Sequence, residues 1–310
     1  MKSLLRKILL GNASAKDYQS VTLAGDAAES VWLQADEQTM DVSKNHWVLA
    51  LDPMVFGIWL DKKTQVSKAR HFNLYFRGPA SMAGTGPLLA RLSLNYFDAI
   101  DEPGGSLLLL QVQQSRIYHV SPLKARLLFL NYYKTPQTDF RRLKALAAAF
   151  SYPRQVRVVS FGRDDQYNIF PMDLLGEMNA GDNFVFGLRH SNASLAKMME
   201  TKKMVVSEVS YEHKDAIYQL GKYHSSTIPP PALLPFPLVK SERFGFYVPA
   251  WADSYTELDI VKTLNLGSHM LLWAKAVSRT RLKGSTGRLF HLHSLAWLRQ
   301  SKNGPSYSLV

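Results

Sequence analysis

The chain has 310 residues, of which 46% are hydrophobic and 20% are charged, the composition of a soluble globular protein. It contains no cysteine, which excludes disulfides, thiolate zinc sites, iron–sulfur clusters and cysteine nucleophiles. The formal net charge of +12 favours anionic partners such as phosphorylated cofactors, nucleic acid or a membrane surface. No acidic residue follows Asp259, but basic residues without a nucleic-acid-binding module are more typical of a solvated face, so nucleic acid is disfavoured.

The N-terminal segment, residues 1–15, predicts a surface helix with Leu4, Leu5, Ile8 and Leu9 on one side. Its apolar run is too short for a signal peptide, and no stretch of the chain approaches the length of a membrane span. We therefore expect a cytoplasmic protein with no membrane span.

Residues 1–152 predict a mixed α+β domain, to which the sequence assigns no role. Short apolar and aromatic runs predict strands at 30–35, 47–52, 56–61, 72–77 and 106–113. Helices are predicted over 121–133 and 137–150, the second with Thr138 or Asp139 as its N-cap. Tyr152-Pro153 ends that helix and marks a domain boundary.

Residues 153–310 predict a second domain that is richer in strands. Strands are expected at 156–162, 184–189, 204–210, 267–280 and 288–298, and helices at 190–203 and 213–225. The proline-rich stretch 228–239 predicts an extended connection. No internal repeat is evident in the sequence.

The junction of a predicted strand and helix gathers polar residues that suit a phosphate group. They are Arg189, His190, Ser191, Asn192 and Ser194. The first turn of a helix offers free backbone N–H groups, and an arginine with hydroxyls adds charge-assisted hydrogen bonds. The alternative is plain helix capping, because serine and asparagine are common caps.

The stretch "DDQYNIFPMDLLGEM" at 164–178 places a proline inside an apolar run. Because proline cannot donate to a sheet, we expect the backbone to leave regular pairing there and to turn its polar groups toward a ligand. The residues concerned are Asn168, Ile169, Phe170, Pro171 and Met172. The alternative is an irregular loop with a buried phenylalanine and methionine.

The order of these segments resembles the flavin reductase family of FMN-binding split barrels. The resemblance covers roughly residues 155–277 and rests on "YNIFPMDLLGEM", "LRHSNAS", "LGKYHS" and "LNLGSHMLLWAKAV". It implies a mainly β fold with helices (α+β), an FMN ring near Asn168–Met172, a phosphate near Arg189–Ser194, and a Gly-x-His strand carrying His269. It also implies NADH or NADPH as electron donor, and a homodimer with the flavin near the subunit interface.

These observations predict an FMN-binding flavoprotein that acts as an NAD(P)H-dependent flavin reductase or a related oxidoreductase. The alternatives are a non-catalytic flavin-binding protein with an N-terminal interaction domain, and a basic nucleic-acid-binding protein. Hydride transfer requires stacked and oriented rings, so no catalytic acid or base is assigned. His269 and His224 could instead be packed core residues, and Asp173 could orient a flavin N–H or cap a loop. His291 and His293 share a strand face, but two ligands without a carboxylate do not predict a metal.

Overall fold

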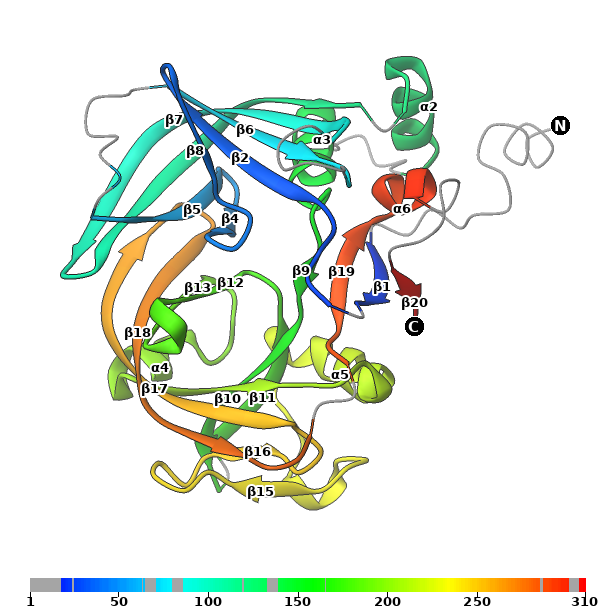
Figure 1. The fold of residues 1–310 in the computed structure, drawn as a ribbon. Helices are drawn as coiled ribbons and strands as arrows, with labels where there is room; N and C mark the ends of the chain where they lie inside the picture. The colour runs from blue at the N-terminus through cyan, green and yellow to red at the C-terminus, as the bar shows by residue number, and fades with distance from the viewer. Residues whose placement is uncertain are drawn as a thin grey trace, which may run out of the picture.

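The structure, a computed structural model, describes residues 18–23, 25–62, 64, 71–79, 86–118, 120–132, 139–164, 166–284, 287–300 and 307–310. The protein is mainly β, and two seven-stranded antiparallel sheets dominate it. Figure 1 shows the N-terminal sheet above and the C-terminal sheet below, with a small sheet beside both. The helix predicted over residues 1–15 lies outside the described residues.

The N-terminal sheet has the order β3-β2-β6-β7-β8-β5-β4. Its strands are β2 (Ser30–Ala35), β3 (Gln38–Asp41), β4 (His46–Leu51), β5 (Met54–Asp61), β6 (His71–Arg77), β7 (Leu88–Glu102) and β8 (Gly105–Ile117). Alternate residues of β2 are buried, as expected for a strand with one face on the core. Strand β5 is buried along nearly its whole length because one of its faces packs into the core of its own half and the other packs against the C-terminal half.

Two helices follow the N-terminal sheet, α2 (Pro122–Tyr132) and α3 (Phe140–Ala149). Asp139 is the N-cap of α3, since its side chain accepts a 2.8 Å hydrogen bond from the Arg141 N–H. The alanine-rich face of α3, with Ala145, Ala148 and Ala149 buried, packs against β7 and β8. Small side chains allow this helix to approach the sheet closely.

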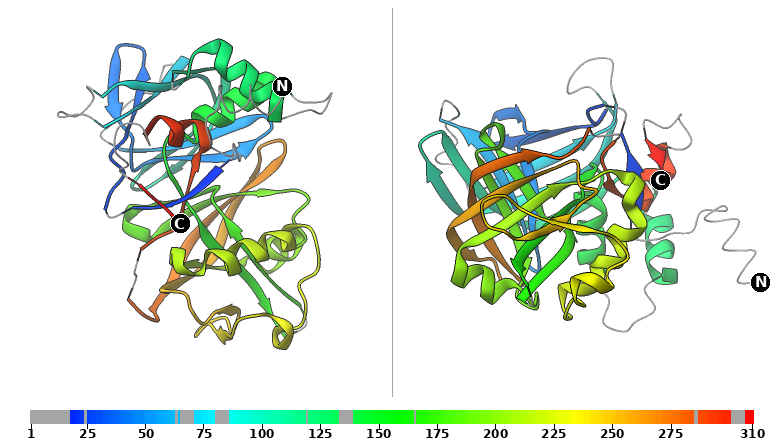
Figure 2. Two further views of the ribbon diagram at one scale, coloured as in Figure 1. Left: turned by 90° about the vertical axis from the view of Figure 1, so that its right-hand side faces the viewer. Right: turned by 90° about the horizontal axis from the view of Figure 1, so that it is seen from below.

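The C-terminal sheet has the order β11-β10-β14-β17-β18-β13-β12. Its strands are β10 (Arg157–Arg163), β11 (Gln166–Met172), β12 (Leu175–Met178), β13 (Asn183–Arg189), β14 (Lys203–Glu208), β17 (Ser254–Asn265) and β18 (His269–Arg281). Between them lie helices α4 (Leu195–Thr201) and α5 (Lys214–Leu220), the 3₁₀ turns η1 (Asn179–Gly181), η2 (Tyr211–His213), η3 (Gly221–His224) and η4 (Pro231–Leu233), and a hairpin of β15 (Leu238–Lys240) and β16 (Tyr247–Pro249). The second view in Figure 2 shows these strands curving around a common interior.

A four-stranded sheet of order β20-β1-β19-β9 lies beside the two large sheets. It joins β1 (Tyr18–Thr22), β9 (Arg154–Gln155), β19 (Phe290–His293) and β20 (Ser308–Leu309), and helix α6 (Ser294–Gln300) follows β19. Segments from the start, middle and end of the chain are thereby held together. No described helix combines the length and apolar character needed to cross a membrane.

The structure corrects several expectations drawn from the sequence. Residues 288–298 were expected to form one strand, but β19 ends at His293 and α6 begins at Ser294. The backbone around Pro171 was expected to leave regular pairing, yet β11 pairs with β10 without interruption, with Pro171 opposite Val158. This is possible because β11 is an edge strand, where a missing N–H removes no ladder bond. Strands β7 and β17 were not expected from the sequence.

Candidate functional site

The two halves of the chain meet at a seam where two hairpin tips touch. Asp52, between β4 and β5, accepts a 2.8 Å hydrogen bond from the Ser268 N–H and donates its own N–H to Ser268 Oγ at 2.9 Å. Gly267 has a φ of 88°, and a Cβ there would lie 2.6 Å from Pro53 Cδ. Glycine is therefore needed at this tip for both backbone conformation and close approach.

His269, the first residue of β18, lies directly behind the seam and is 1% exposed. Its Nδ1 is 2.7 Å from Ser268 Oγ. A hydroxyl can accept two hydrogen bonds and donate one, so the contact with Ser268 fits either tautomer of the ring. Nε2 has no hydrogen-bond partner among the described residues. The ring thus has one buried nitrogen that is unpaired within the described part of the protein.

Positive charge surrounds this ring. Burial, and then the charges of Arg189, His190 and Arg142, lower the pKa of His269 to about 4. Arg189 is the direct strand neighbour of His269, and its side chain and that of His190 are exposed. Arg142 reaches the seam from α3 and lies 3.3 Å from the Asp52 carboxylate. His269 is therefore neutral at physiological pH, within a cationic rim that contains one carboxylate.

The turn from Arg189 to Ser194 is held by Asn192. The Asn192 N–H donates to the Arg189 carbonyl at 2.9 Å, and its Oδ1 accepts from the Ser194 N–H at 2.8 Å. Of the five predicted phosphate residues in this turn, Asn192 and Ser194 are buried and shape the backbone, and Arg189, His190 and Ser191 face solvent.

The stretch from Asn168 to Met172 lies next to that turn, but other residues cover it. Ile169 and Phe170 have no exposed surface, and the Phe170 ring lies 4.7 Å from the ring of His224. His224 Nε2 donates to the Pro171 carbonyl at 2.8 Å, and Asn192 Nδ2 lies 3.3 Å from His224 Nδ1. The turn η3 therefore connects both predicted elements and closes over the apolar side chains.

Asn168 is also occupied by contacts within the protein. Its Nδ2 donates to the Tyr223 carbonyl at 2.9 Å, and its Oδ1 accepts from the Ile169 N–H. Met172 is also buried, at 6% exposed. Within residues 168–172, Pro171 is the one residue that is only half-buried. Any ligand ring beside β11 therefore meets Pro171 and His224 before it meets Phe170.

A groove of about 750 Å³ borders the seam on the side of the N-terminal half. It runs between the end of β8 and helix α3, and its size is typical of a small-molecule site. Its charged lining residues are Asp52, Arg116, Asp139, Arg141, Arg142 and Lys144. Cations outnumber carboxylates here, and Asp52 and Arg142 belong to both the groove and the seam.

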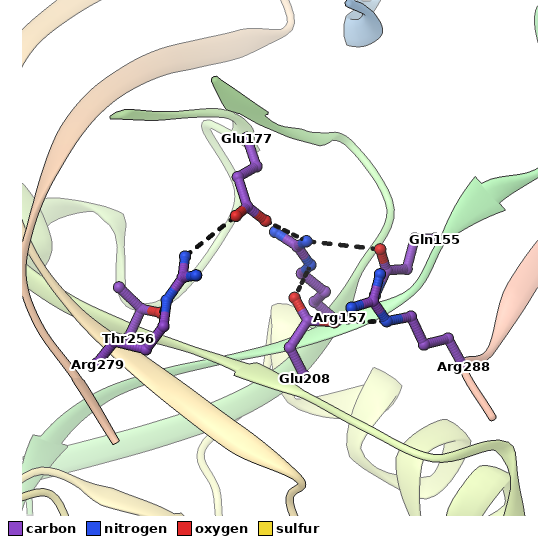
Figure 3. A network of polar contacts seen from close by, with 7 residues as sticks. All are labelled: Gln155, Arg157, Glu177, Glu208, Thr256, Arg279 and Arg288. Atoms are coloured by element: carbon purple, nitrogen blue, oxygen red, sulfur yellow. Dashed lines mark hydrogen bonds and ion pairs between the residues drawn. The ribbon is translucent and has the colours of Figure 1, made fainter. Parts of the chain in front are cut away.

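A second cavity, of about 690 Å³, lies between β4, β12 and the small sheet, and it borders a polar network (Figure 3). Arg157, 5% exposed, donates to Glu177 at 2.5 Å and pairs with Glu208 at 2.6 Å. Arg279 also pairs with Glu177, at 3.0 Å, and Arg288 with Glu208, at 3.6 Å. Each carboxylate thus has two cationic partners, which marks the network as structural.

The remaining candidate polar residues are paired within the protein. Asp173 Oδ2 lies 2.7 Å from His291 Nδ1, so this carboxylate meets an imidazole of β19. His293 Nδ1 accepts from the Leu295 N–H at 3.1 Å. Within the described parts of the chain, no three His, Asp or Glu side chains come together as a metal site would require.

Comparison with known proteins gives structural similarity alone. No family model and no curated protein sequence matches the chain. The solved structures that match are flavin reductase and FMN-binding split-barrel proteins covering about half of the chain. They include an FMN-binding protein from Thermus thermophilus (19% identity, 43% of this chain and 73% of that one, TM-score 0.38). Others are the NADH:FAD oxidoreductase SgcE6 of Streptomyces globisporus (15%, 50% and 94%, TM-score 0.44) and the flavin reductase PheA2 (14%, 56% and 99%, TM-score 0.41).

The seam contains residues that sequence reasoning did not select. Asp52 and Arg142 come from the N-terminal half, which the sequence left without a role, and Ser268 contacts both Asp52 and His269. The "DP" tip at 52–53 was a signal for a turn. No local pattern indicates that this turn meets the "GSH" segment more than 200 residues later.

Proposed function

We propose that the seam binds FMN and that the protein is an NAD(P)H-dependent flavin reductase or a related flavin oxidoreductase. The observation that carries the proposal is the cationic rim of Arg189 and Arg142, which lies over a neutral, buried His269 and beside a groove of ligand size. An anionic nucleotide is the ligand class that such a site suits. The choice of FMN among such nucleotides rests on the sequence resemblance.

The phosphate end of FMN fits the exposed part of the turn. Arg189 and Ser191 supply a cation and a hydroxyl, and Arg142 approaches from the other half of the chain. His269 lies behind these groups as a neutral ring and adds no charge to the site. FMN, when bound, would supply the hydride acceptor, and the side chains of this chain bind and orient it.

The burial of the β11 side chains affects how tightly the flavin ring would be held. With Ile169 and Phe170 enclosed, the ring would rest on Pro171 and His224 and would keep one face open. A flavin held chiefly through its phosphate exchanges readily with free flavin. This favours an enzyme that takes up oxidised flavin and releases reduced flavin over one that retains a tightly bound prosthetic group.

The test measures FMN binding by the variant Arg189→Ala, with quenching of flavin fluorescence as the signal. Loss of a charge-assisted hydrogen bond costs about 1.5–3 kcal/mol, so the Kd should rise by about 10- to 100-fold. The matched control is Lys197→Ala, which removes an exposed cation from helix α4 without touching the turn. If Arg189→Ala bound FMN as tightly as the control, the phosphate assignment would be wrong.

Turnover separates the enzyme from a non-catalytic flavin-binding protein. We expect the protein with excess FMN to oxidise NADH or NADPH continuously, with a rate that saturates in both substrates. Flavin binding without any oxidation of either nicotinamide would instead support the non-catalytic alternative. A parallel assay without added FMN reports whether the chain retains flavin of its own.

A further inference from the structure

The two large sheets of the chain have the same strand order. Numbered by their place along the chain, the seven strands of each sheet follow one another as second, first, fifth, sixth, seventh, fourth and third. Every neighbouring pair in both sheets is antiparallel. Two unrelated seven-stranded sheets would not be expected to share the whole order.

The long hairpin of each sheet carries the same two irregularities. In β7–β8 the register shifts after Ser93 and again between Tyr96 and Asp98, with three residue pairs between the shifts. In β17–β18 it shifts after Glu257 and again between Ile260 and Lys262, again with three pairs between. The residue skipped at the second shift is outward-facing in both cases, since Phe97 is 41% and Val261 46% exposed. Such bulges are specific features of a fold.

These shared shifts align the two halves residue by residue. Asp98 and Leu109, paired next to the second shift, correspond to Lys262 and Trp273. Counting toward the tips, Gly104 then corresponds to Ser268, and Gly105 to His269. On the neighbouring strands, Asp61 pairs with Gly105 and Arg189 pairs with His269, so Asp61 corresponds to Arg189. One strand further, Trp47 pairs with Gly57 and Gly176 pairs with Val185, so Trp47 corresponds to Gly176.

The contacts between the halves obey a twofold relation under this alignment. Trp47 packs onto its own counterpart, because a Cβ on Gly176 would overlap the indole ring. Ser268 touches the β4–β5 tip at Asp52, and its counterpart Gly104 lies against Asn179 in the β12–β13 tip, where a Cβ would be 3.4 Å from Nδ2. Reciprocal contacts of this kind define an isologous interface.

The apolar core of the interface repeats the same relation. One buried cluster contains three counterpart pairs, one member of each coming from either half. They are Leu107 with Leu271, Leu109 with Trp273, and the partly buried Ile100 with Leu264. A cluster shared in this manner resembles a subunit interface placed inside one chain.

The two halves differ at the seam residues. Where the C-terminal half has Arg189 and His269, the N-terminal half has Asp61 and Gly105. The nearby Glu102, 9% exposed at its side chain, is neutralised by Lys262 at 3.0 Å and Lys275 at 3.4 Å from the other half. The N-terminal half thus has an acid where the C-terminal half has Arg189, and no side chain where it has His269. The N-terminal half therefore lacks an equivalent anion site.

We infer that the chain is an internal pseudodimer, in which an N-terminal barrel without an anion site acts as the built-in partner of the C-terminal barrel. It supplies the Asp52 tip and Arg142 to the single ligand site of the chain. The working particle is then one chain with one bound nucleotide, in place of the homodimer that the resemblance implies. The pairing rests on the fold, whereas the nature of the nucleotide rests on the proposed function.

Native mass spectrometry of the full chain in excess FMN tests this inference, because it counts chains and ligands in one particle. We expect a mass of one chain, 35.0 kDa, with one FMN. A two-chain particle at micromolar concentration would overturn the built-in partner, and two FMN on one chain would overturn the loss of the N-terminal site. One chain with no FMN would contradict the proposed function and leave the pairing supported.

The contribution of the N-terminal half is tested by Arg142→Ala in the same experiment and by FMN titration. We expect the particle to remain one chain and the Kd for FMN to rise about tenfold. Arg126→Ala, which removes an exposed cation of α2, serves as the matched control. Equal FMN affinity in the two variants would remove Arg142 from the site and contradict a site shared between the halves.

Discussion

Three histidines of the described chain are buried as neutral rings, His46, His269 and His293. Burial lowers the pKa of His293 to about 4, and its Nδ1 accepts the Leu295 N–H at the start of α6. Burial also lowers the pKa of His46 well below its usual value. Because the unfolded chain binds protons at these positions near pH 6.5, the folded state loses stability as the pH falls from about 6.5 to about 4.

The pH dependence can be assigned to one ring with the variant His293→Asn. An asparagine oxygen can still accept the Leu295 N–H, but the side chain takes up no proton. The free energy of unfolding of both proteins should fall as the pH decreases. Near pH 5 we expect the slope for the variant to be smaller than that for the natural chain by about 1.4 kcal/mol per pH unit. Urea unfolding between pH 7 and pH 4.5 measures both slopes. Parallel curves for the variant and the natural chain would show that His293 is not neutral when folded.

Glu257 is a fully buried carboxylate that organises the turn before β16. It accepts hydrogen bonds from the Phe244 N–H at 2.6 Å, the Arg243 N–H at 3.1 Å and the hydroxyls of Ser241 and Ser278 at 2.7 and 2.5 Å. Burial alone would raise the pKa of this carboxyl, but these hydrogen bonds outweigh burial and the pKa is lowered. The charge is therefore held by donors alone.

Replacement of this carboxylate by an amide should be costly. Glu257→Gln places an NH₂ group among donors, so at least one buried donor loses its acceptor, and we expect a loss of about 2–4 kcal/mol in the free energy of unfolding. Urea unfolding at neutral pH measures the loss. Glu242→Gln, at an exposed neighbouring side chain, should change stability by less than about 0.5 kcal/mol. Similar stabilities for the two variants would contradict this role of Glu257.

At the scale of elements, helix α4 ends on a residue with unfavourable backbone geometry. Lys202 has φ 56° and ψ 28°, the left-handed conformation that helix C-termini commonly adopt with glycine. A side chain in this region costs about 1 kcal/mol relative to glycine. The lysine therefore holds a conformation for which its Cβ is poorly suited.

Lys202→Gly should raise the free energy of unfolding by about 0.5–1 kcal/mol. The control is Lys203→Gly, which removes the same charge one residue later, in β14, where glycine should destabilise the strand by a similar amount. Opposite signs for the two variants are expected in thermal unfolding. If both variants were destabilised equally, the geometry of the α4 C-terminus would be incorrectly assigned.

The elements also show what the sequence could and could not predict. Strands with alternating or continuous apolar residues, such as β2 and β5, were predicted, and so was the helix capped by Asp139. Strand β17 was missed because two adjacent polar residues, Thr256 and Glu257, are buried in it and find their partners elsewhere in the chain. Pro171 was misjudged because sequence alone does not show that β11 lies at an edge.

At the scale of the whole molecule, the candidate site was only half predictable. Arg189 and Ser191 were grouped because they are close in sequence, and His269 was named through the family resemblance. All three belong to the C-terminal half. Asp52 and Arg142 reach the seam only because the two halves pack together, and the halves differ at equivalent positions such as Asp61 and Arg189. A repeat conserved in strand order but not in residue type leaves no periodic signal in the sequence.

The pairing of the halves also predicts that they unfold together. Gly187 in β13 lies against the backbone of β4, and a Cβ there would overlap the Leu49 carbonyl oxygen, which a rigid strand cannot move aside. Gly187→Ala must therefore separate β4 from β13, and we expect a loss of more than about 3 kcal/mol. Gly25→Ala, where nothing lies within 4 Å of the added Cβ, is the matched control.

The form of the unfolding transition decides whether this damage stays local. Because the cluster around Trp59 and Trp273 contains residues from both halves of the chain, its loss removes core from each of them. We expect Gly187→Ala to lower one shared transition, with tryptophan fluorescence and far-ultraviolet circular dichroism changing at the same urea concentration. Two separate transitions, only one of which moved, would mean that the two halves are independently stable. The N-terminal half would then be an attached domain, and the interface would not be a core common to both.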